Sequence, residues 1–324
     1  MNLIKEVEQA GKVISLSLQH DEGLEIIHQA SLDLLDEIGL KIYSPESREI
    51  LGDNGAIIEG EMVRFPANLI MDALESAPES ITLAGRDPEK TVQTQLGQIG
   101  FTNFGEALCF INPFTKKYAP STKEDLGMVI KMADAMDEMD FAYRALASRD
   151  CDTSTQSLHN MEAVINNTGK HFFIGTDSLK NSLKMIEMAQ LVAGGKENLA
   201  KNPIFSFMCC PLSPLQITPE CSDVIVAAAR AGIPAVVVSE VMAGATSPAS
   251  MGASLVQHNA EVLGGIALSQ YAKKGAPVIY GSTSSIMDMR FATCSVGCPE
   301  LGMFSATLSR LARNYKLPCM MAGG

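Results

Sequence analysis

Residues 1–97 combine helical spacing of apolar side chains with short alternating runs that favour small strands. Apolar or small side chains recur every three or four residues along a first helix, which Gly39 ends: Leu24, Ile27, Ser31, Leu34, Leu35 and Ile38. A second helix is predicted over Pro66 to Ala77, and the alternation from Ile81 to Leu83 predicts a strand. We therefore expect an N-terminal α+β cap segment over residues 1–97.

From residue 98 onward, short apolar runs alternate with long amphipathic ones, which is typical of repeated βα units. Seven strands are predicted: Ile99–Thr102, Phe141–Ala147, His171–Gly175, Ile204–Cys209, Ala235–Ser239, Val278–Gly281 and Pro318–Ala322. The helices between them carry start signals: Thr122 with Asp125 as a capping box, Thr218 before Pro219, Ser247 before Pro248, and Pro299 before Glu300. No glycine fingerprint opens a helix, so the α/β pattern favours a (β/α)8 TIM-type barrel over a doubly wound sheet.

The predicted barrel is incomplete at its C-terminal end. Residues 98–324 supply about seven of the eight strands, and the chain ends directly after the last of them. An open seam leaves unpaired strand edges and half-covered apolar faces in contact with water. We therefore expect the chain alone to aggregate or to unfold in part.

Composition narrows the class of protein. Apolar residues make up 46% of the chain and charged residues 19%, which indicates a globular protein. The formal net charge is −12 and the basic residues are scattered, so nucleic acid is not an expected partner. The chain shows neither a signal peptide nor an uninterrupted apolar run of membrane-spanning length, so we expect a soluble cytoplasmic protein without membrane contact. Cys294 and Cys298 lack a second pair at metal spacing, and no metal site is predicted.

Several stretches of the chain resemble the trimethylamine methyltransferase family. The longest begins at Ser239 and reads SEVMAGATSPASMGASLVQHNAEVLGG; shorter ones are PLSPL from Pro211, APVIYGS from Ala276, GCPELG from Gly297 and LPCMMAGG from Leu317. In that family the final Gly-Gly pair is followed by pyrrolysine, which an in-frame amber codon encodes, and the protein then continues. The resemblance implies that this chain is the upstream portion of such an enzyme; a genuine short relative is the alternative.

The resemblance also implies a reaction. Direct displacement of a methyl group from a neutral tertiary amine would expel an amide anion, so the family uses the pyrrolysine imine to quaternise the nitrogen. A cobalt(I) corrinoid, carried by a separate protein and not bound by this chain, then accepts the methyl group, as in archaeal methanogenesis from methylamines. This chain alone is therefore expected to be inactive, and the full-length protein to be a homo-oligomer. Two alternatives stay open: a betaine-type methyltransferase without pyrrolysine, and a non-catalytic fragment that binds the corrinoid protein.

Candidate site residues follow the predicted strands, because barrel active sites gather at the carboxyl ends of the strands. Glu240 is expected to stabilise a developing cation or to orient the imine, and Tyr280 to contact a methylammonium group through its ring. Ser282, Thr283 and Glu106 are expected to bind substrate. The alternatives are a loop anion for Glu240, a packed side chain for Tyr280 and a turn cap for Glu106.

Other polar residues are expected to be structural. Gln257, Asn259 and Glu261 fall inside a predicted helix, where structural hydrogen bonding is favoured over catalysis. The five histidines show no spacing typical of a metal site or a catalytic triad: His20, His28, His159, His171 and His258. His171 begins a predicted strand, which is the end of the barrel opposite to the expected active site.

Overall fold

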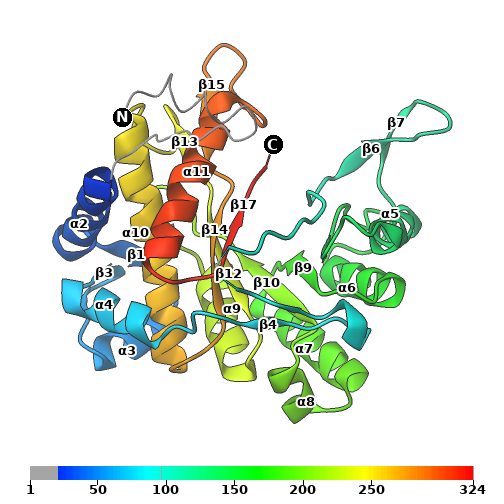
Figure 1. The fold of residues 1–324 in the computed structure, drawn as a ribbon, viewed down its shortest axis with the longest axis horizontal. Helices are drawn as coiled ribbons and strands as arrows, with labels where there is room; N and C mark the ends of the chain where they lie inside the picture. The colour runs from blue at the N-terminus through cyan, green and yellow to red at the C-terminus, as the bar shows by residue number, and fades with distance from the viewer. Residues whose placement is uncertain (1–20, 96, 324) are drawn as a thin grey trace.

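A sheet of six parallel strands forms the centre of the protein in a computed structural model, which describes residues 21–95 and 97–323. The strands follow one another in sequence order and curl into half of a barrel (Figure 1). They are β8 (Ala142–Tyr143), β9 (Phe172–Gly175), β10 (Phe205–Cys209), β12 (Ala235–Ser239), β14 (Val278–Ser282) and β17 (Cys319–Met321). All five pairings between neighbouring strands are parallel. Six of the seven predicted strands are confirmed in place, and the structure is a mixed α/β half-barrel.

Helices connect these strands and cover the outer face of the sheet (Figure 1). They are α5 (Lys123–Ala135), α6 (Gln156–Asn167), α7 (Leu179–Ala193), α8 (Lys196–Lys201), α9 (Pro219–Ala231), α10 (Met251–Ala272) and α11 (Pro299–Asn314). The Thr122–Asp125 capping box is confirmed, as are proline at the first position of α9 and α11. The start predicted after Ser247 is wrong, because α10 begins three residues later with Ser250 as its N-cap.

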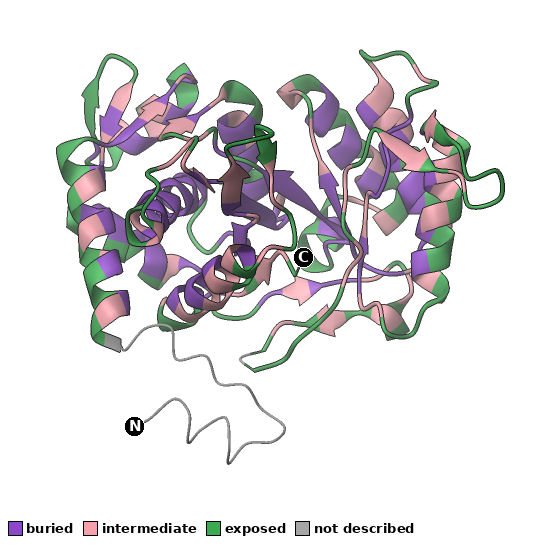
Figure 2. Ribbon diagram, turned by 90° about the horizontal axis from the view of Figure 1, so that it is seen from above, coloured by how far each residue is buried: buried purple, intermediate pink, exposed green. Residues whose placement is uncertain are grey.

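Helix α10 is buried on every side because it lies between the sheet and the N-terminal elements. Two adjacent glycines permit this close packing. A Cβ atom on Gly264 would lie 2.2 Å from Leu40, which belongs to the N-terminal layer, and one on Gly265 would lie 2.7 Å from Val237 in β12. Figure 2 shows the buried helix and strands surrounded by exposed peripheral loops. A helix buried all round needs hydrogen-bond partners for its polar side chains, and α10 buries several of them, including Gln257, Asn259 and Glu261.

The N-terminal elements pack on the far side of α10. They are α2 (Asp21–Glu37), β1 (Leu40–Ile42), α3 (Pro45–Asp53), β2 (Ile57–Glu59), β3 (Met62–Arg64) and α4 (Ala67–Ser76). Gly39 ends α2 with a φ of +82°, and both helices predicted in this part are confirmed. Strand β1 pairs in parallel with β11 (Gln216–Ile217), which follows β10. This pairing ties the N-terminal segment to the half-barrel, and a domain boundary at residue 97 stays a prediction.

A hairpin crosses the inner face of the half-barrel. It consists of β4 (Thr82–Leu83), the short 3-10 helix η1 (Pro88–Lys90) and β5 (Val92–Gln93). Its apolar side chains join a second core cluster with residues of the inner sheet face: Ile81, Leu83, Phe141, Phe173, Met208, Val236, Val238 and Ile279. The hairpin therefore shields this inner surface from water.

The first predicted barrel strand, Ile99–Thr102, is wrong. In the structure Ile99 and Phe101 are exposed, and the backbone first bridges its neighbour at Ala107, opposite Leu146. Opposite Tyr143 a side chain takes the place of backbone pairing: Asn103 accepts a hydrogen bond from the Tyr143 amide at 2.9 Å and donates to the Tyr143 carbonyl at 2.8 Å. The apolar alternation there reflects a loop beside β8.

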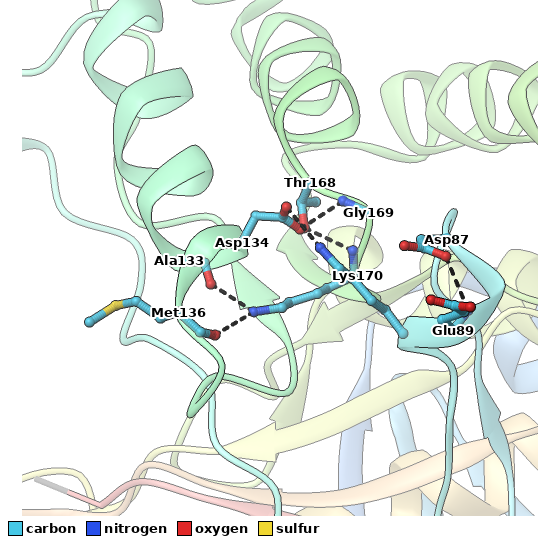
Figure 3. Close-up of polar contacts among 9 residues, drawn as sticks. Asp87, Glu89, Ala133, Asp134, Met136, Thr168, Gly169 and Lys170 are labelled. Atoms are coloured by element: carbon cyan, nitrogen blue, oxygen red, sulfur yellow. Dashed lines mark hydrogen bonds and ion pairs between the residues drawn. The ribbon is translucent and has the colours of Figure 1, made fainter.

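A buried lysine fixes the end of the sheet where the parallel strands begin (Figure 3). Lys170, just before β9, donates from Nζ to the carbonyls of Ala133 at 2.9 Å and Met136 at 2.7 Å, at the end of α5. Asp134, in the same turn, pairs with Lys90 of η1 at 3.0 Å. Burial lowers the pKa of Lys170, and the nearby negative charge of Asp134 opposes this shift.

Three short strands lie beyond the carboxyl ends of the main sheet: β13 (Met242–Ala243), β15 (Ser285–Asp288) and β16 (Thr293–Cys294). A further hairpin, of β6 (Cys109–Ile111) and β7 (Tyr118–Pro120), projects away from the body (Figure 1). Of the helices in residues 21–95 and 97–323, none has the length and apolar character needed to cross a membrane.

Candidate active site

Glu106 is held rigidly at the carboxyl ends of β8 and β9. Its carboxylate accepts a hydrogen bond from the Gly175 amide at 2.9 Å and forms an ion pair with Arg144. A Cβ atom on Gly175 would lie 2.4 Å from the Glu106 carboxylate, so only glycine fits beneath it. The Gly175 amide and Arg144 thus fix the position of the Glu106 carboxylate, and these contacts differ from those of a residue that only caps a turn.

Glu240 follows β12, at the same edge of the sheet. Among the residues that the structure describes, none donates a hydrogen bond to its carboxylate. The side chain reaches solvent, yet the surrounding protein desolvates it enough to raise the pKa of Glu240 above the usual value. An exposed carboxylate with no protein donor retains its full capacity to accept a ligand.

Tyr143 ends β8, at the same edge of the sheet as these two carboxylates, and the sequence did not single it out. Its ring packs edge-on against Phe173, with 6.4 Å between centroids, and a Cβ atom on Gly105 would lie 3.1 Å from it. Burial, followed by the charge of Glu106 and more weakly that of Glu240, raises the pKa of the Tyr143 phenol, which stays protonated. We call Glu106, Tyr143 and Glu240 the strand-end site.

Cys210, which directly follows β10, is affected by the same two carboxylates. Burial, then the charges of Glu106 and Glu240, raise the pKa of its thiol to about 12. Both carboxylates therefore act on the residue after β10, as expected when strands of one parallel sheet end together. Arg144 balances the charge of Glu106, whereas Glu240 has no described partner. The charge of Glu240 and the nearby π-face of Tyr143 together favour an organic cation.

Tyr280 lies outside the strand-end site. Its side chain is fully buried on the face of β14 that meets the helices, and its hydroxyl donates to the Asn259 side-chain oxygen at 2.9 Å. Asn259 in turn donates to the Tyr315 hydroxyl at 2.9 Å. This is the position of a packed tyrosine, the alternative that the sequence left open, and a contact between Tyr280 and substrate stays a prediction.

The two hydroxyl residues after Tyr280 differ in their surroundings. Ser282 is buried, and its hydroxyl accepts a hydrogen bond from the Ser284 amide at 3.2 Å. Thr283 is half-buried and its amide donates to the Ser239 carbonyl at 3.3 Å. The Thr283 bond holds the ends of β12 and β14 together, whereas the Ser282 bond is local, and the roles of both residues in binding substrate stay predictions.

Glu261 of α10 organises the loops beneath the site. Its buried carboxylate accepts four hydrogen bonds: from the hydroxyls of Ser213 at 2.7 Å and Ser239 at 2.6 Å, the Leu215 amide at 2.9 Å, and the Gln257 side chain at 2.9 Å. The structural role expected for Gln257 and Glu261 is seen in these bonds, and that expected for Asn259 is seen in its bonds to Tyr280 and Tyr315. Because Ser239 directly precedes Glu240, this hydrogen-bond network fixes the backbone position of Glu240.

The cysteines and histidines form no metal centre within residues 21–95 and 97–323, where no three potential ligands gather. Cys298 lies 3.5 Å from the Ser285 hydroxyl. Burial lowers the pKa of His171 to about 4 and that of His258 to about 3, so both are neutral near pH 7. His171 contacts the carbonyls of Ala84 and Pro203, at the start of β9 as predicted; His20 lies outside the described residues.

The curled parallel half-barrel, with ionisable residues gathered at its strand ends, defines a protein of the (β/α)-barrel class. A family profile described as trimethylamine methyltransferase (MTTB) matches residues 4–324. The chain therefore belongs to the trimethylamine methyltransferase family, as the sequence resemblance indicated.

Individual relatives agree with this family. The chain is 45% identical over 306 residues to trimethylamine methyltransferase MttB of the bacterium Desulfitobacterium hafniense, covering 94% of the chain and 62% of that protein. It is 35% identical over 317 residues to MttB of Methanosarcina thermophila, with 96% and 66% covered. A glycine betaine methyltransferase of D. hafniense is 31% identical over 305 residues, with 94% and 64% covered. An archaeal source stays a prediction.

Solved structures show the same fold. The monomethylamine methyltransferase (MtmB) of Methanosarcina barkeri superposes with a TM-score of 0.60 at 13% identity, over 98% of this chain and 65% of that one. At this identity the likeness concerns the fold alone. The chain spans from 62% to 66% of the length of the curated relatives compared above.

Proposed function

We propose that the protein containing this chain transfers a methyl group from trimethylamine to the cobalt(I) centre of a separate corrinoid protein. The observation that supports this most directly is the convergence of Glu106, Tyr143 and Glu240 at the strand ends of a trimethylamine methyltransferase family member. We further propose that the longer protein completes a (β/α)8 barrel, acts in the cytoplasm and forms a homo-oligomer.

The reaction breaks a carbon–nitrogen bond whose electron pair stays on nitrogen. Transfer of a methyl group from neutral trimethylamine would expel an amide anion, which is a very poor leaving group, so the nitrogen must first gain positive charge. Pyrrolysine, which the resemblance places after Gly324, would supply the electrophile for this step. Ionised Glu240 and Glu106 would then stabilise the cationic nitrogen, with the Tyr143 ring face beside it.

The corrinoid supplies the nucleophile that accepts the methyl group, and it would stay on its own protein. The strand-end site suits this arrangement because the Glu240 side chain reaches solvent. Glu106 contributes a charge whose position does not change, since Arg144 and the Gly175 amide already hold it. This chain would therefore orient the methylated nitrogen toward the solvent-exposed side of the site, from which a partner protein could approach.

Demethylation of glycine betaine is the second candidate, because a glycine betaine methyltransferase is 31% identical to this chain. The nitrogen of a betaine is already quaternary, so its methyl transfer needs no electrophile. Its carboxylate, however, would meet the negative charge of Glu240, which no described residue pairs, whereas Arg144 balances the charge of Glu106. Like charges at close range disfavour binding, so the strand-end site favours an amine without an attached carboxylate.

The test is methyl transfer by the full reading frame, expressed with pyrrolysine supplied and mixed with a cobalt(I) corrinoid protein. Trimethylamine should be demethylated faster than dimethylamine or glycine betaine at equal concentrations, and omission of pyrrolysine should abolish the reaction. Equal or faster turnover of glycine betaine would overturn the proposed substrate. Binding of the corrinoid protein without any methyl transfer would support a non-catalytic role instead.

A further inference from the structure

The hairpin of β6 and β7 bears large apolar side chains that no other part of the described chain covers. We call residues 108–120 the arm; it projects from the body beside α5 (Figure 1). Phe114 at its tip is 90% exposed and Tyr118 is 75% exposed. Two further apolar residues of the arm and three in the segment leading to it are also exposed: Leu108, Ile111, Ile99, Phe101 and Phe104. Contiguous apolar exposure of this kind marks an interaction surface.

The arm holds one conformation through its own hydrogen bonds. Its tip is an Asx-type turn in which the Asn112 side chain accepts from the amides of Phe114 at 3.0 Å and Thr115 at 2.9 Å. At its base, the Ser121 hydroxyl donates to the Ala147 carbonyl at 2.7 Å, beside β8. The apolar side chains are thus presented on a preorganised frame, so covering them costs little conformational entropy.

The charge of the arm is opposite to that of the whole chain. Lys116 and Lys117 lie at the tip, and residues 108–120 contain no aspartate or glutamate, whereas the chain has a net charge of −12. A partner for the arm should therefore combine an apolar surface with negative charge. A second copy of this chain meets the electrostatic requirement.

The exposed area is sufficient for a specific interface. At roughly 200 Å² for each fully exposed aromatic side chain, the four exposed rings alone offer about 600 Å². With Ile99, Leu108 and Ile111, the surface approaches the ~800 Å² per partner that stable complexes bury. In a two-fold dimer each arm would contact the other copy, so the same surface is used twice.

We propose that the arm is a self-association surface, through which each copy of the chain contacts a second copy by an apolar tip flanked by lysines. This inference rests on the homo-oligomer proposed above and assigns its contact surface. Phe114 and Tyr118 supply the apolar contact, while Lys116 and Lys117 meet acidic surface of the other copy.

Sedimentation velocity of the full-length protein, from about 1 to 100 μM, tests the proposal. The unmodified protein should show a concentration-dependent dimer. Phe114→Asp should raise the dissociation constant at least about tenfold, as expected for truncation of an interface anchor. The double substitution Lys116→Glu with Lys117→Glu should weaken association most at low salt, where screening is weakest.

Leu191→Asp is the matched control, because Leu191 is also exposed, at 83%, but lies on α7 away from the arm. It should leave the dissociation constant unchanged. Equal weakening by Leu191→Asp and Phe114→Asp, or a monomer at all concentrations, would overturn the proposal. Arm-dependent co-sedimentation of a monomeric chain with phosphatidylglycerol vesicles would also overturn it, in favour of a membrane. Because sedimentation does not report methyl transfer, failure here leaves the proposed activity separately testable.

Discussion

Replacing Glu240 with glutamine in the full-length protein should lower the rate of methyl transfer at least about tenfold, which corresponds to about 1.4 kcal/mol. The carboxylate has no protein donor among the described residues, so its charge is available to the positive nitrogen. Glutamine has nearly the same shape but no charge, and the substitution therefore removes the electrostatic contribution alone. Initial rates of cobalt methylation measure the effect.

The pH dependence gives this prediction a second readout. Desolvation raises the pKa of Glu240 above the usual glutamate value, so the ionised form is lost at a higher pH than for an exposed glutamate. The acid limb of kcat/KM should accordingly lie above the usual glutamate range, with the rate falling as pH falls through the raised pKa. Glu240→Gln should remove that limb.

A matched substitution separates this role from a general change in charge. Glu138 is exposed just before β8, at the opposite end of the strands, and Glu138→Gln should change neither the rate nor the acid limb. An unaltered rate in Glu240→Gln would reduce Glu240 to a loop anion, the alternative that its sequence position also allowed.

Replacing Glu261 with alanine should destabilise the fold by about 3–5 kcal/mol, because several buried hydrogen-bond donors lose their acceptor at once. The hydroxyls of Ser213 and Ser239 and the Leu215 amide would each lose their acceptor. Urea unfolding followed by circular dichroism measures the loss as a lower midpoint at unchanged slope. Glu261→Gln keeps one acceptor oxygen and should cost less.

The control for this prediction is a surface glutamate on α7, a helix on the outside of the half-barrel. Glu187 on α7 pairs only with Lys184 in solvent, so Glu187→Ala should change stability by less than about 0.5 kcal/mol. If Glu261→Ala has no larger effect than Glu187→Ala, then the carboxylate does not organise the loops below the strand-end site.

The sequence predicted strands best where the apolar run is continuous and bounded. Strand β12 occupies Ala235–Ser239 as predicted, because five buried residues follow the turn after α9 and end at a charged residue. A continuous apolar run does not, however, indicate which face of a strand points into the barrel, because both faces are apolar in a parallel sheet. For this reason the sequence suggested a substrate contact for Tyr280, whereas the neighbouring Ile279 lies on the inner face.

Tyr143 could not be singled out from the sequence, because its position depends on contacts between distant segments. The predicted strand Phe141–Ala147 runs past Tyr143, whereas β8 ends there. The strand is short because Asn103, forty residues earlier, bonds the Tyr143 backbone. Glu240, by contrast, was found because it directly follows a well-defined strand. Residues at strand ends are thus predictable only as far as the strand boundaries are.

The claim that the strand-end site binds a methylated cation is tested most directly by calorimetric titration of the full-length protein. Tetramethylammonium chloride should bind, whereas its neutral isostere 2,2-dimethylpropane dissolved to saturation should not compete, because shape alone lacks the charge that two carboxylates and an aromatic face recognise. Tyr143→Leu should weaken tetramethylammonium binding about fivefold or more. Equal affinity in wild type and in a protein carrying both Glu240→Gln and Tyr143→Leu would contradict the assignment of this site.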